Sequence, residues 1–234
     1  MSNHSTLPIL YSDAYLVVVH KPSGLAVHRG WANDEVTATD LLRNQLGEAV
    51  SPVHRLDRAT SGVLVFVRSA EVAKIVSTQF EEGKVRKVYW ALVRGSTPDE
   101  GVIDHPIPRR EGGPRVPAVT HYKTLARASN PLPTVHAVSW VEAYPQTGRL
   151  HQVRRHLKHI SHPIIGDANY GKGPINRAFA EQYHLTRLAL HAAFLTLDHP
   201  TTGEPITFSA ALATDLSNAL ERLHLTPATD GATP

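Results

Sequence analysis

Residues 52–62 read P-V-H-R-L-D-R-A-T-S-G and lead directly into the apolar run V-L-V-F-V at residues 63–67. The T-S-G triplet at 60–62 has the residue types typical of a turn, so the sequence predicts a polar turn that feeds a strand. Such a strand fixes the carboxylate of this stretch, Asp57, beside a rigid sheet. The segment therefore predicts an element of the fold and the position of a candidate functional side chain.

The residues that flank Asp57 are basic or able to become so: His54, Arg55 and Arg58. Nearby positive charge favours the ionised form of a carboxylate. An ionised carboxylate suits a nucleophile or a base better than a general acid. However, Arg-Asp-Arg clusters at strand ends are often only surface ion-pair networks. These residues alone leave a catalytic and a structural interpretation open.

Outward from this segment, the pattern predicts more strands than helices, because the chain has 15 Gly and 17 Pro and hence many turns. We expect strands at residues 9–11, 16–20, 63–67, 85–94, 119–127, 134–142, 188–197 and 206–208. These do not alternate regularly with helices. An α+β fold with a mixed or antiparallel sheet is therefore favoured over a doubly wound parallel one.

Cap residues and hydrophobic spacing predict five helices. Thr39 is the expected N-cap of a helix that Gly47 closes, and Ser69 is the expected N-cap of a second helix. Further helices are expected at residues 150–160 and 174–184, and from a cap at Thr214 or Asp215 to residue 223. Residues 109–117, rich in Pro, Gly and Arg, are expected to form an exposed loop.

The composition limits the classes of protein that the chain can represent. The 234 residues carry a net charge of +3 and contain no Cys, which excludes disulfides, thiolate zinc sites and thiol nucleophiles. No apolar stretch approaches the length of a membrane span, and residues 1–8 do not resemble a signal peptide. We expect a soluble cytoplasmic protein with one domain over residues 1–225 and a flexible tail at 226–234.

The densest basic stretch, T-G-R-L-H-Q-V-R-R-H-L-K-H at residues 147–159, is a second candidate for function. On a helix, His151 and Arg155 project together because they are four residues apart. Arg149 precedes the helix N-terminus, which itself attracts anions. The stretch is a solvated amphipathic helix, or a phosphate-binding wall in which one Arg pairs with a catalytic carboxylate.

A metal site built from His151, His156 and His159 is disfavoured, because the surrounding cations would repel a dication. Phosphate-loop, dinucleotide and nucleophile-elbow patterns are absent from the sequence, so we expect no cofactor and no metal. Tyr89, on the expected strand at 85–94, is either a core residue or a flat surface on which an extruded base stacks.

Taken together, six motifs in this order resemble the RluA-type pseudouridine synthases. They are D…K-P-S-G…V-H at 13–28, H-R-L-D…T-S-G at 54–62, K-V-Y at 87–89, G-R-L-H-Q-V-R at 148–154, H-P-I-I-G-D at 162–167 and L-A-L-H-A at 188–192. The resemblance implies a mixed, mostly antiparallel sheet with flanking helices and a central RNA-binding cleft. It also implies a catalytic domain over residues 1–225, like that of members without an S4 RNA-binding domain.

The resemblance also implies roles for single residues. Asp57 matches the catalytic aspartate, Arg154 the arginine that forms a salt bridge with it, and Tyr89 the tyrosine that stacks on the target base. Arg55 matches the arginine that enters the RNA helix as the uridine flips out, and Leu190 an apolar residue packed beside the base. The other expected substrate-binding residues are His54, Arg149, His151, Gln152 and Arg155.

Within the family, R-G-W at 29–31, P-A-V-T-H-Y at 117–122 and N-R at 176–177 resemble the subgroup that modifies uridine 65 of tRNA. We therefore expect a monomeric, cofactor-free enzyme that isomerises a tRNA uridine to pseudouridine by base flipping. A related synthase acting on rRNA is the first alternative. An RNA-binding protein that has lost catalysis is the second, and a metal phosphodiesterase is a distant third.

Overall fold

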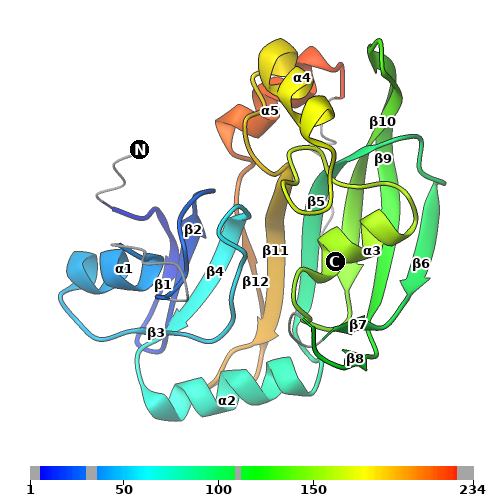
Figure 1. Ribbon diagram of the computed structural model, residues 1–234. Coiled ribbons are helices and arrows are strands. Elements are labelled where there is room, and N and C mark those ends of the chain that lie inside the picture. The colour runs from blue at the N-terminus through cyan, green and yellow to red at the C-terminus, as the bar shows by residue number, and fades with distance from the viewer. Residues whose placement is uncertain (1–5, 30–35, 109–111, 226–234) are drawn as a thin grey trace. The chain divides into compact units, whose positions relative to one another are not determined.

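The structure is a computed structural model that describes residues 6–29, 36–108 and 112–225 (Figure 1). The expected tail at 226–234 lies outside these residues. The chain divides into two compact units, one of residues 1–88 and 191–211 and the other of residues 89–190 and 212–234. Each unit is described by itself below.

The first unit is built on the strand that the Asp57 segment was expected to feed. Its elements are β1 (Ile9–Ser12), β2 (Leu16–Lys21), α1 (Ala38–Leu46), β3 (Ser51–Pro52), β4 (Ser61–Val67), α2 (Ala70–Glu81), β11 (Leu190–Asp198, from its second residue on) and β12 (Pro205–Ser209). Strand β4 pairs antiparallel with β2 and β3 and parallel with β11. All seven residues of β4 are buried, as its continuous apolar sequence predicts.

The core of this unit lies between α2 and the sheet. Alternate residues of β2 and β4 supply Leu16, Val18, Val63, Val65 and Val67, and helix α2 adds Val72 and Val76. The period of two in the strands places these side chains on one face of the sheet. Helix α2 covers that face, which fixes the strand that follows the Asp57 turn.

The second unit contains a long antiparallel ladder. Its elements are β5 (Arg86–Arg94, from Tyr89 on), β6 (Glu100–Asp104), β7 (Ile107–Pro108), β8 (Arg115–Val116), β9 (Val119–Leu132), β10 (Val135–Pro145), α3 (Gln152–His159), α4 (Gly173–Tyr183) and α5 (Thr214–Arg222). Strand β10 lies between β5 and β9, and β6 pairs with the outer side of β9. Helix α3 packs on β9 and β10, and α4 contacts α5 (Figure 1).

The α+β class and the mixed sheet are confirmed. Strand β4 pairs parallel with β11, whereas the antiparallel pairs of the described residues include those given above and also β1 with β2, β7 with β8 and β11 with β12. The expected caps at Ser69 and Gly47 are confirmed as well. The Ser69 hydroxyl accepts a hydrogen bond from the Val72 N–H at 3.2 Å, and Gly47 ends α1 in the left-handed conformation.

Two predicted caps were wrong. Thr37, not Thr39, caps α1, because its hydroxyl accepts from the Asp40 N–H while the Asp40 carboxylate accepts from the Thr37 N–H. The Thr39 hydroxyl instead donates to the Val27 carbonyl. Helix α5 begins after Ala213 and has no side-chain cap, so neither Thr214 nor Asp215 fills that position.

The ladder of the second unit differs from the predicted strands in several places, among them the extension of β10 to Pro145, three residues beyond the expected end at residue 142. Residues 109–117 were expected to be loop throughout, but Arg115–Val116 forms β8 and pairs with Ile107–Pro108. Strand β9 continues to Leu132, beyond the expected end at residue 127. Strand β6 was missed, because it is an edge strand in which Val102 stays 60% exposed and only Ile103 is buried.

None of the described helices combines the length and the apolar character that crossing a lipid bilayer requires.

Candidate active site

Asp57 lies in the turn between β3 and β4, in the first unit. The Thr60 N–H donates to the Asp57 carbonyl at 3.0 Å and closes the turn just before β4 begins. The residues of the turn differ in burial: Leu56 is buried, Asp57 is half-buried, and Arg55 and Arg58 are exposed. The buried strand and the Leu56 anchor therefore hold Asp57 at a half-buried position.

The loop after β2 binds the backbone of the Asp57 turn at residues 58 and 59. The ammonium of Lys21 is fully buried and donates to the carbonyls of Pro22 (2.8 Å), Leu25 (2.8 Å) and Arg58 (3.1 Å). The Ser23 hydroxyl donates to the Ala59 carbonyl at 2.7 Å, and the Gly24 N–H donates to the Arg58 carbonyl at 2.9 Å. A buried ammonium needs such oxygen partners to offset its lost hydration. The K-P-S-G loop thus fixes the backbone directly after Asp57.

Gly62 lets β4 approach β11 at the end of the turn. Ser61 and Gly62 pair in parallel with His191 and Ala192. Gly62 has a φ of 120°, and a Cβ atom there would lie 2.1 Å from the Ala192 carbonyl oxygen. Beside it, the Ser61 hydroxyl lies 2.9 Å from Nδ1 of His191, whose Nε2 lies 3.1 Å from the Ala210 carbonyl. Because a carbonyl only accepts, Nε2 of His191 carries the proton and Nδ1 accepts from Ser61.

His54 is held as a neutral ring. It stacks on Phe80 at 5.1 Å between ring centroids, and the Val65 N–H donates to its Nε2 at 3.0 Å. Burial, with a smaller effect of the Lys87 charge, lowers the pKa of His54 to about 3. Near neutral pH, His54 therefore adds no positive charge beside Asp57, and its expected contact with RNA stays a prediction.

Arg154 lies on α3 in the second unit and is buried against a carboxylate. Its Nε donates to Oδ2 of Asp167 at 2.8 Å and its Nη2 donates to Oδ1 at 2.9 Å. Arg154 is 7% exposed and Asp167 is 1% exposed. Burial opposes the ionisation of Asp167, but hydrogen bonds from Arg154 and from the Tyr170 backbone outweigh it and lower the pKa of this carboxyl. The pair is therefore ionic at neutral pH.

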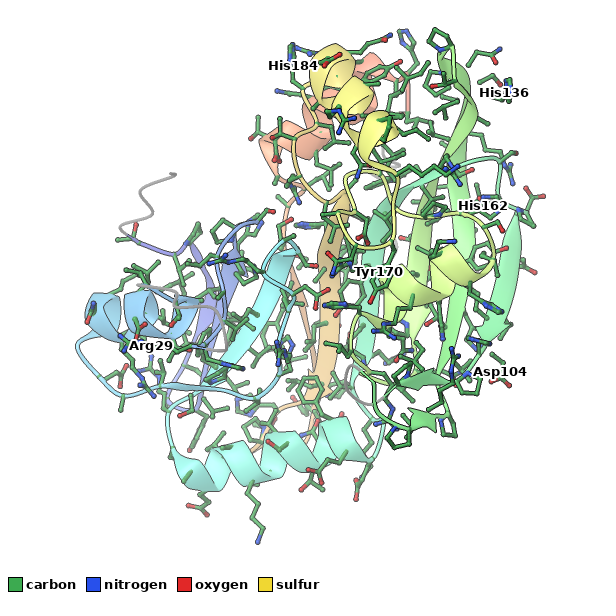
Figure 2. The ribbon with its side chains drawn as sticks, viewed as in Figure 1. Arg29, Asp104, His136, His162, Tyr170 and His184 are labelled. Atoms are coloured by element: carbon green, nitrogen blue, oxygen red, sulfur yellow. The ribbon has the colours of Figure 1, made fainter. Side chains whose placement is uncertain are left out.

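Tyr170 lies on the loop after α3 (Figure 2) and contacts several residues of the basic stretch. Its hydroxyl accepts a hydrogen bond from Nε of Arg155 at 2.7 Å and lies within hydrogen-bond distance, 2.9 Å, of Nδ1 of His151. Its ring lies 5.1 Å from the Arg154 guanidinium carbon, a cation–π distance. The expectation that His151 and Arg155 project together is confirmed, since both contact one hydroxyl.

Gln152 holds the turn that precedes α3. Its amide nitrogen donates to the Val119 carbonyl at 2.9 Å and to the Thr120 hydroxyl at 3.1 Å. Its amide oxygen accepts from the Thr147 hydroxyl at 2.6 Å and from the Arg149 N–H at 3.0 Å. These bonds leave the side chain of Arg149 exposed at the helix N-terminus. Contacts of Gln152 and Arg149 with RNA stay predictions.

The three histidines considered as metal ligands have separate environments. His151 contacts Tyr170, whereas His156 is buried with its ring nitrogens 2.8 Å from the Thr120 hydroxyl and 2.9 Å from the His105 carbonyl. The exposed His159 stacks on His105, with 3.7 Å between ring centroids. Hydrogen bonds to protein groups thus occupy both ring nitrogens of His156, which argues against a shared metal ion.

Tyr89 is the first residue and Leu190 the last residue of the first segment of the second unit. Tyr89 is half-buried on β5 and pairs with Ala143 of β10. Leu190 is 3% exposed, and the adjacent Ala189 carbonyl accepts from the Leu92 N–H. Asp57 belongs to the first unit, whereas Tyr89 and Arg154 belong to the second. The salt bridge expected between Asp57 and Arg154 therefore stays a prediction.

Three residues received no role from the sequence although each holds a candidate residue within its own unit: Lys21 beside the Asp57 turn, and Asp167 and Tyr170 beside Arg154. Two of them, Lys21 and Asp167, lie inside motifs that carry the family resemblance, and Tyr170 follows three residues after Asp167. The signal that points to Lys21 and Asp167 is a charged residue in an otherwise apolar or turn-forming segment. A charge in such a place needs a buried partner.

Comparisons with known proteins give the context of this geometry. A sequence profile of the family described as RNA pseudouridylate synthase matches residues 15–159. A protein of Pectobacterium carotovorum subsp. carotovorum, named tRNA pseudouridine synthase C, is 44% identical over 228 residues, which cover 90% of this chain and 60% of that protein's length. A Salmonella typhimurium protein of the same name is 43% identical over 222 residues, 88% of this chain and 85% of that protein.

The fold is also similar to a solved human structure, described as RNA pseudouridylate synthase domain containing 4. The two superpose with a TM-score of 0.72 at 28% sequence identity, over 93% of this chain and 93% of that chain.

Proposed function

The chain belongs to the RNA pseudouridylate synthase family, in its RluA-type branch, and we propose that it isomerises a uridine of tRNA, at position 65, to pseudouridine. The tRNA substrate is supported by relatives 44% and 43% identical that bear the name tRNA pseudouridine synthase C. Position 65 is supported by the subgroup motifs at residues 29–31, 117–122 and 176–177.

The reaction needs a carboxylate more than any other group. It breaks the N1–C1′ glycosidic bond, rotates the uracil and forms a C5–C1′ bond. C5 loses a proton and N1 gains one, so atoms and electrons balance without a redox partner. An ionised carboxylate can attack C1′, add to C6 of the ring, or remove the 2′ proton. Each route uses the same group, and we assign it to Asp57.

The observation that carries this assignment is the way the Asp57 turn is held. Three independent hydrogen bonds, from Lys21, Ser23 and Gly24, fix the Arg58 and Ala59 carbonyls directly after it. A surface ion-pair network needs no such support, whereas a reacting group gains rate from a fixed position. Compared with the motif carboxylate Asp167, which is buried in an ion pair, Asp57 combines this support with a half-buried position.

A uridine stacked in a helix reaches such a site only after it has been extruded, which costs a few kcal/mol, roughly. We assign Arg55 to the space that the base vacates, since its side chain is exposed beside Asp57. Tyr89 is assigned to stack on the uracil during its rotation, with Leu190 packed nearby. Arg149 and Arg155 are assigned to phosphates, which makes binding sensitive to salt.

Release of tritium from C5-labelled uridine tests the proposal, because the chemistry must exchange that hydrogen with water. Purified protein would be incubated with tritiated total tRNA and, separately, with tritiated rRNA. We expect release from tRNA, and a reduction on the order of 10³-fold or more in Asp57→Asn, which keeps the size of the side chain but removes its charge. Asp99→Asn is the matched control, since Asp99 is an exposed carboxylate paired with Arg127 in the other unit.

Each outcome assigns or removes part of the proposal. Release from rRNA but not from tRNA would keep the enzyme class and overturn the substrate. Release that persists in Asp57→Asn would overturn the role of Asp57. Carbodiimide treatment of the RNA marks pseudouridine as a stop in reverse transcription. A stop at a position other than 65 would overturn position 65 as the target.

A further inference from the structure

We propose that Asp167 is the positioning residue for Arg154, holding its guanidinium in the one orientation that can support the reacting carboxylate. This inference rests on the proposed function, because it assigns a role to Arg154 in the same reaction. Asp167 does not touch the substrate in this proposal. It acts through Arg154.

The two contacts of the pair fix one edge of the guanidinium. Asp167 receives Nε and Nη2 of Arg154, at 2.8 and 2.9 Å, so the pairing is side-on. A guanidinium is planar and its five N–H groups have fixed directions. Once the Nε and Nη2 edge is bound, the direction of the opposite edge, which carries Nη1, is determined. That opposite edge has the geometry to receive a second carboxylate.

Tyr170 fixes the plane of the same guanidinium. Its ring lies 5.1 Å from the guanidinium carbon of Arg154. The Tyr170 hydroxyl is itself held by Arg155 and His151, two residues of α3 and its cap. An edge contact and a face contact together remove the rotations that an unrestrained arginine side chain retains, and so reduce the entropy lost when a substrate complex forms.

A single short turn supplies both contacts. Oδ1 of Asp167 accepts from the N–H groups of Asn169 (2.9 Å) and Tyr170 (3.0 Å) in addition to Nη2 of Arg154. The carboxylate therefore orders the turn that carries Tyr170 while it binds the arginine. With four donors it is satisfied on both oxygens, which a buried carboxylate requires.

The turn is anchored so that Asp167 cannot follow Arg154 when the arginine moves. The Asn176 side chain of α4 accepts from the Gly166 N–H at 3.0 Å and donates to the Asp167 carbonyl at 2.9 Å. Gly166 has a φ of 77°, and a Cβ atom there would lie 1.9 Å from the Arg187 carbonyl oxygen. The backbone at Asp167 is thus fixed by α4 and by close packing, and Arg154 adapts to it.

The test separates catalysis from RNA binding. Asp167→Asn keeps the shape but loses the charge, and we expect its single-turnover rate of tritium release to fall by about 10- to 100-fold. The RNA dissociation constant, measured by filter binding, is expected to stay within about threefold of the wild-type value, because Arg154 is buried and contributes little to phosphate binding. Asp167→Glu restores the charge and should recover part of the rate.

Asp215→Asn is the matched control. Asp215 binds Nε and Nη2 of Arg187 at 2.7 and 3.1 Å, in the same side-on geometry and in the same unit. Its loss is expected to leave the single-turnover rate unchanged. A loss of rate as large as that of Asp167→Asn would show that breaking any such pair harms the enzyme through stability, and would overturn the proposal. An unchanged rate in Asp167→Asn would do the same.

Hydrogen exchange of the Arg154 side chain gives a readout that does not depend on turnover. In the wild-type protein, we expect the Nε–H of Arg154 to exchange with solvent more slowly in NMR spectra than that of exposed arginines. Rapid exchange would overturn the proposal, even if Asp167→Asn did not fold. If the wild-type protein released no tritium from any RNA, the proposed function would fail while the exchange measurement still decided the positioning of Arg154.

Discussion

Replacement of Gly62 by Ala tests how closely the Asp57 turn depends on the packing of β4 against β11. A Cβ atom at residue 62 would lie 2.1 Å from the Ala192 carbonyl oxygen, whereas real Cβ atoms are essentially never found closer than 3.0 Å. The two strands would have to separate by about 0.9 Å at their parallel pairing. The atoms that the Cβ would meet all belong to the Ala192 backbone, and the Cβ position is itself fixed by the backbone of residue 62, so no side-chain rotation relieves the clash.

Two contributions make up the expected loss of stability. A non-glycine residue at positive φ costs about 1–3 kcal/mol. Separation of the strands also weakens the Ser61–His191 contact and its neighbouring backbone hydrogen bonds, each of which contributes about 1 kcal/mol. We expect Gly62→Ala to lose about 4 kcal/mol or more, a large part of the 5–15 kcal/mol typical of a folded protein.

Gly24→Ala is the control that separates backbone strain from the clash. Gly24 has a φ of 87°, but a Cβ atom added there would have no described atom within 4 Å beyond its chain neighbours. This variant should lose only about 1–2 kcal/mol. Urea denaturation followed by circular dichroism gives both values. Stabilities of Gly62→Ala and Gly24→Ala within about 0.5 kcal/mol of each other would refute the reasoning from the Ala192 contact.

Two further predictions concern His54 and Ser69. The pKa of His54 is about 3 in the folded protein and near 6.5 in the unfolded chain. As the pH falls below 6.5, the unfolded chain therefore binds a proton that the folded protein does not, and the folded protein loses stability. When the pH is lowered from 7 to 5, the free energy of unfolding measured with urea should fall by about 1–2 kcal/mol more for the wild-type protein than for His54→Gln. The lower value applies if solvent reaches the ring. Equal losses in the two proteins would contradict a neutral His54 ring. Ser69→Ala removes the acceptor of the Val72 N–H and should lower the free energy of unfolding by about 1 kcal/mol in the same assay. Ser69→Asp keeps an acceptor there and should retain most of that stability. Equal destabilisation by Ala and Asp would argue against the cap.

Local signals in the sequence were sufficient for much of the fold. Ser69 and Gly47 predicted helix ends because capping depends on a few adjacent residues. The continuous apolar run at 63–67 predicted a strand, and β4 is that strand, with all seven of its residues buried. The cap of α1 was misassigned although its signal was present. Thr37 has Asp40 three residues later, the spacing of a capping box, whereas Thr39 has no such partner.

The parts that were missed depend on residues distant in the sequence. Strand β6 has few apolar residues because its outer edge has no described strand beside it, so its pattern resembles that of a loop. The spacing of the basic stretch predicted which residues share a face of α3, but not that Arg154 is buried. That burial depends on Asp167, 13 residues away beyond a turn, whose charge makes it tolerable.

The contacts of Lys21 couple the proposed reacting carboxylate to the order of folding. Its ammonium joins the loop after β2 to a carbonyl 37 residues later in the chain, next to Asp57. A partly folded chain in which β2 and β4 have not yet paired cannot form this contact, because loop closure over that distance depends on the strands. The Asp57 turn would then take its final shape only once β2 and β4 have paired. A chain in which these strands are unpaired, although it contains the same aspartate, would not act on RNA.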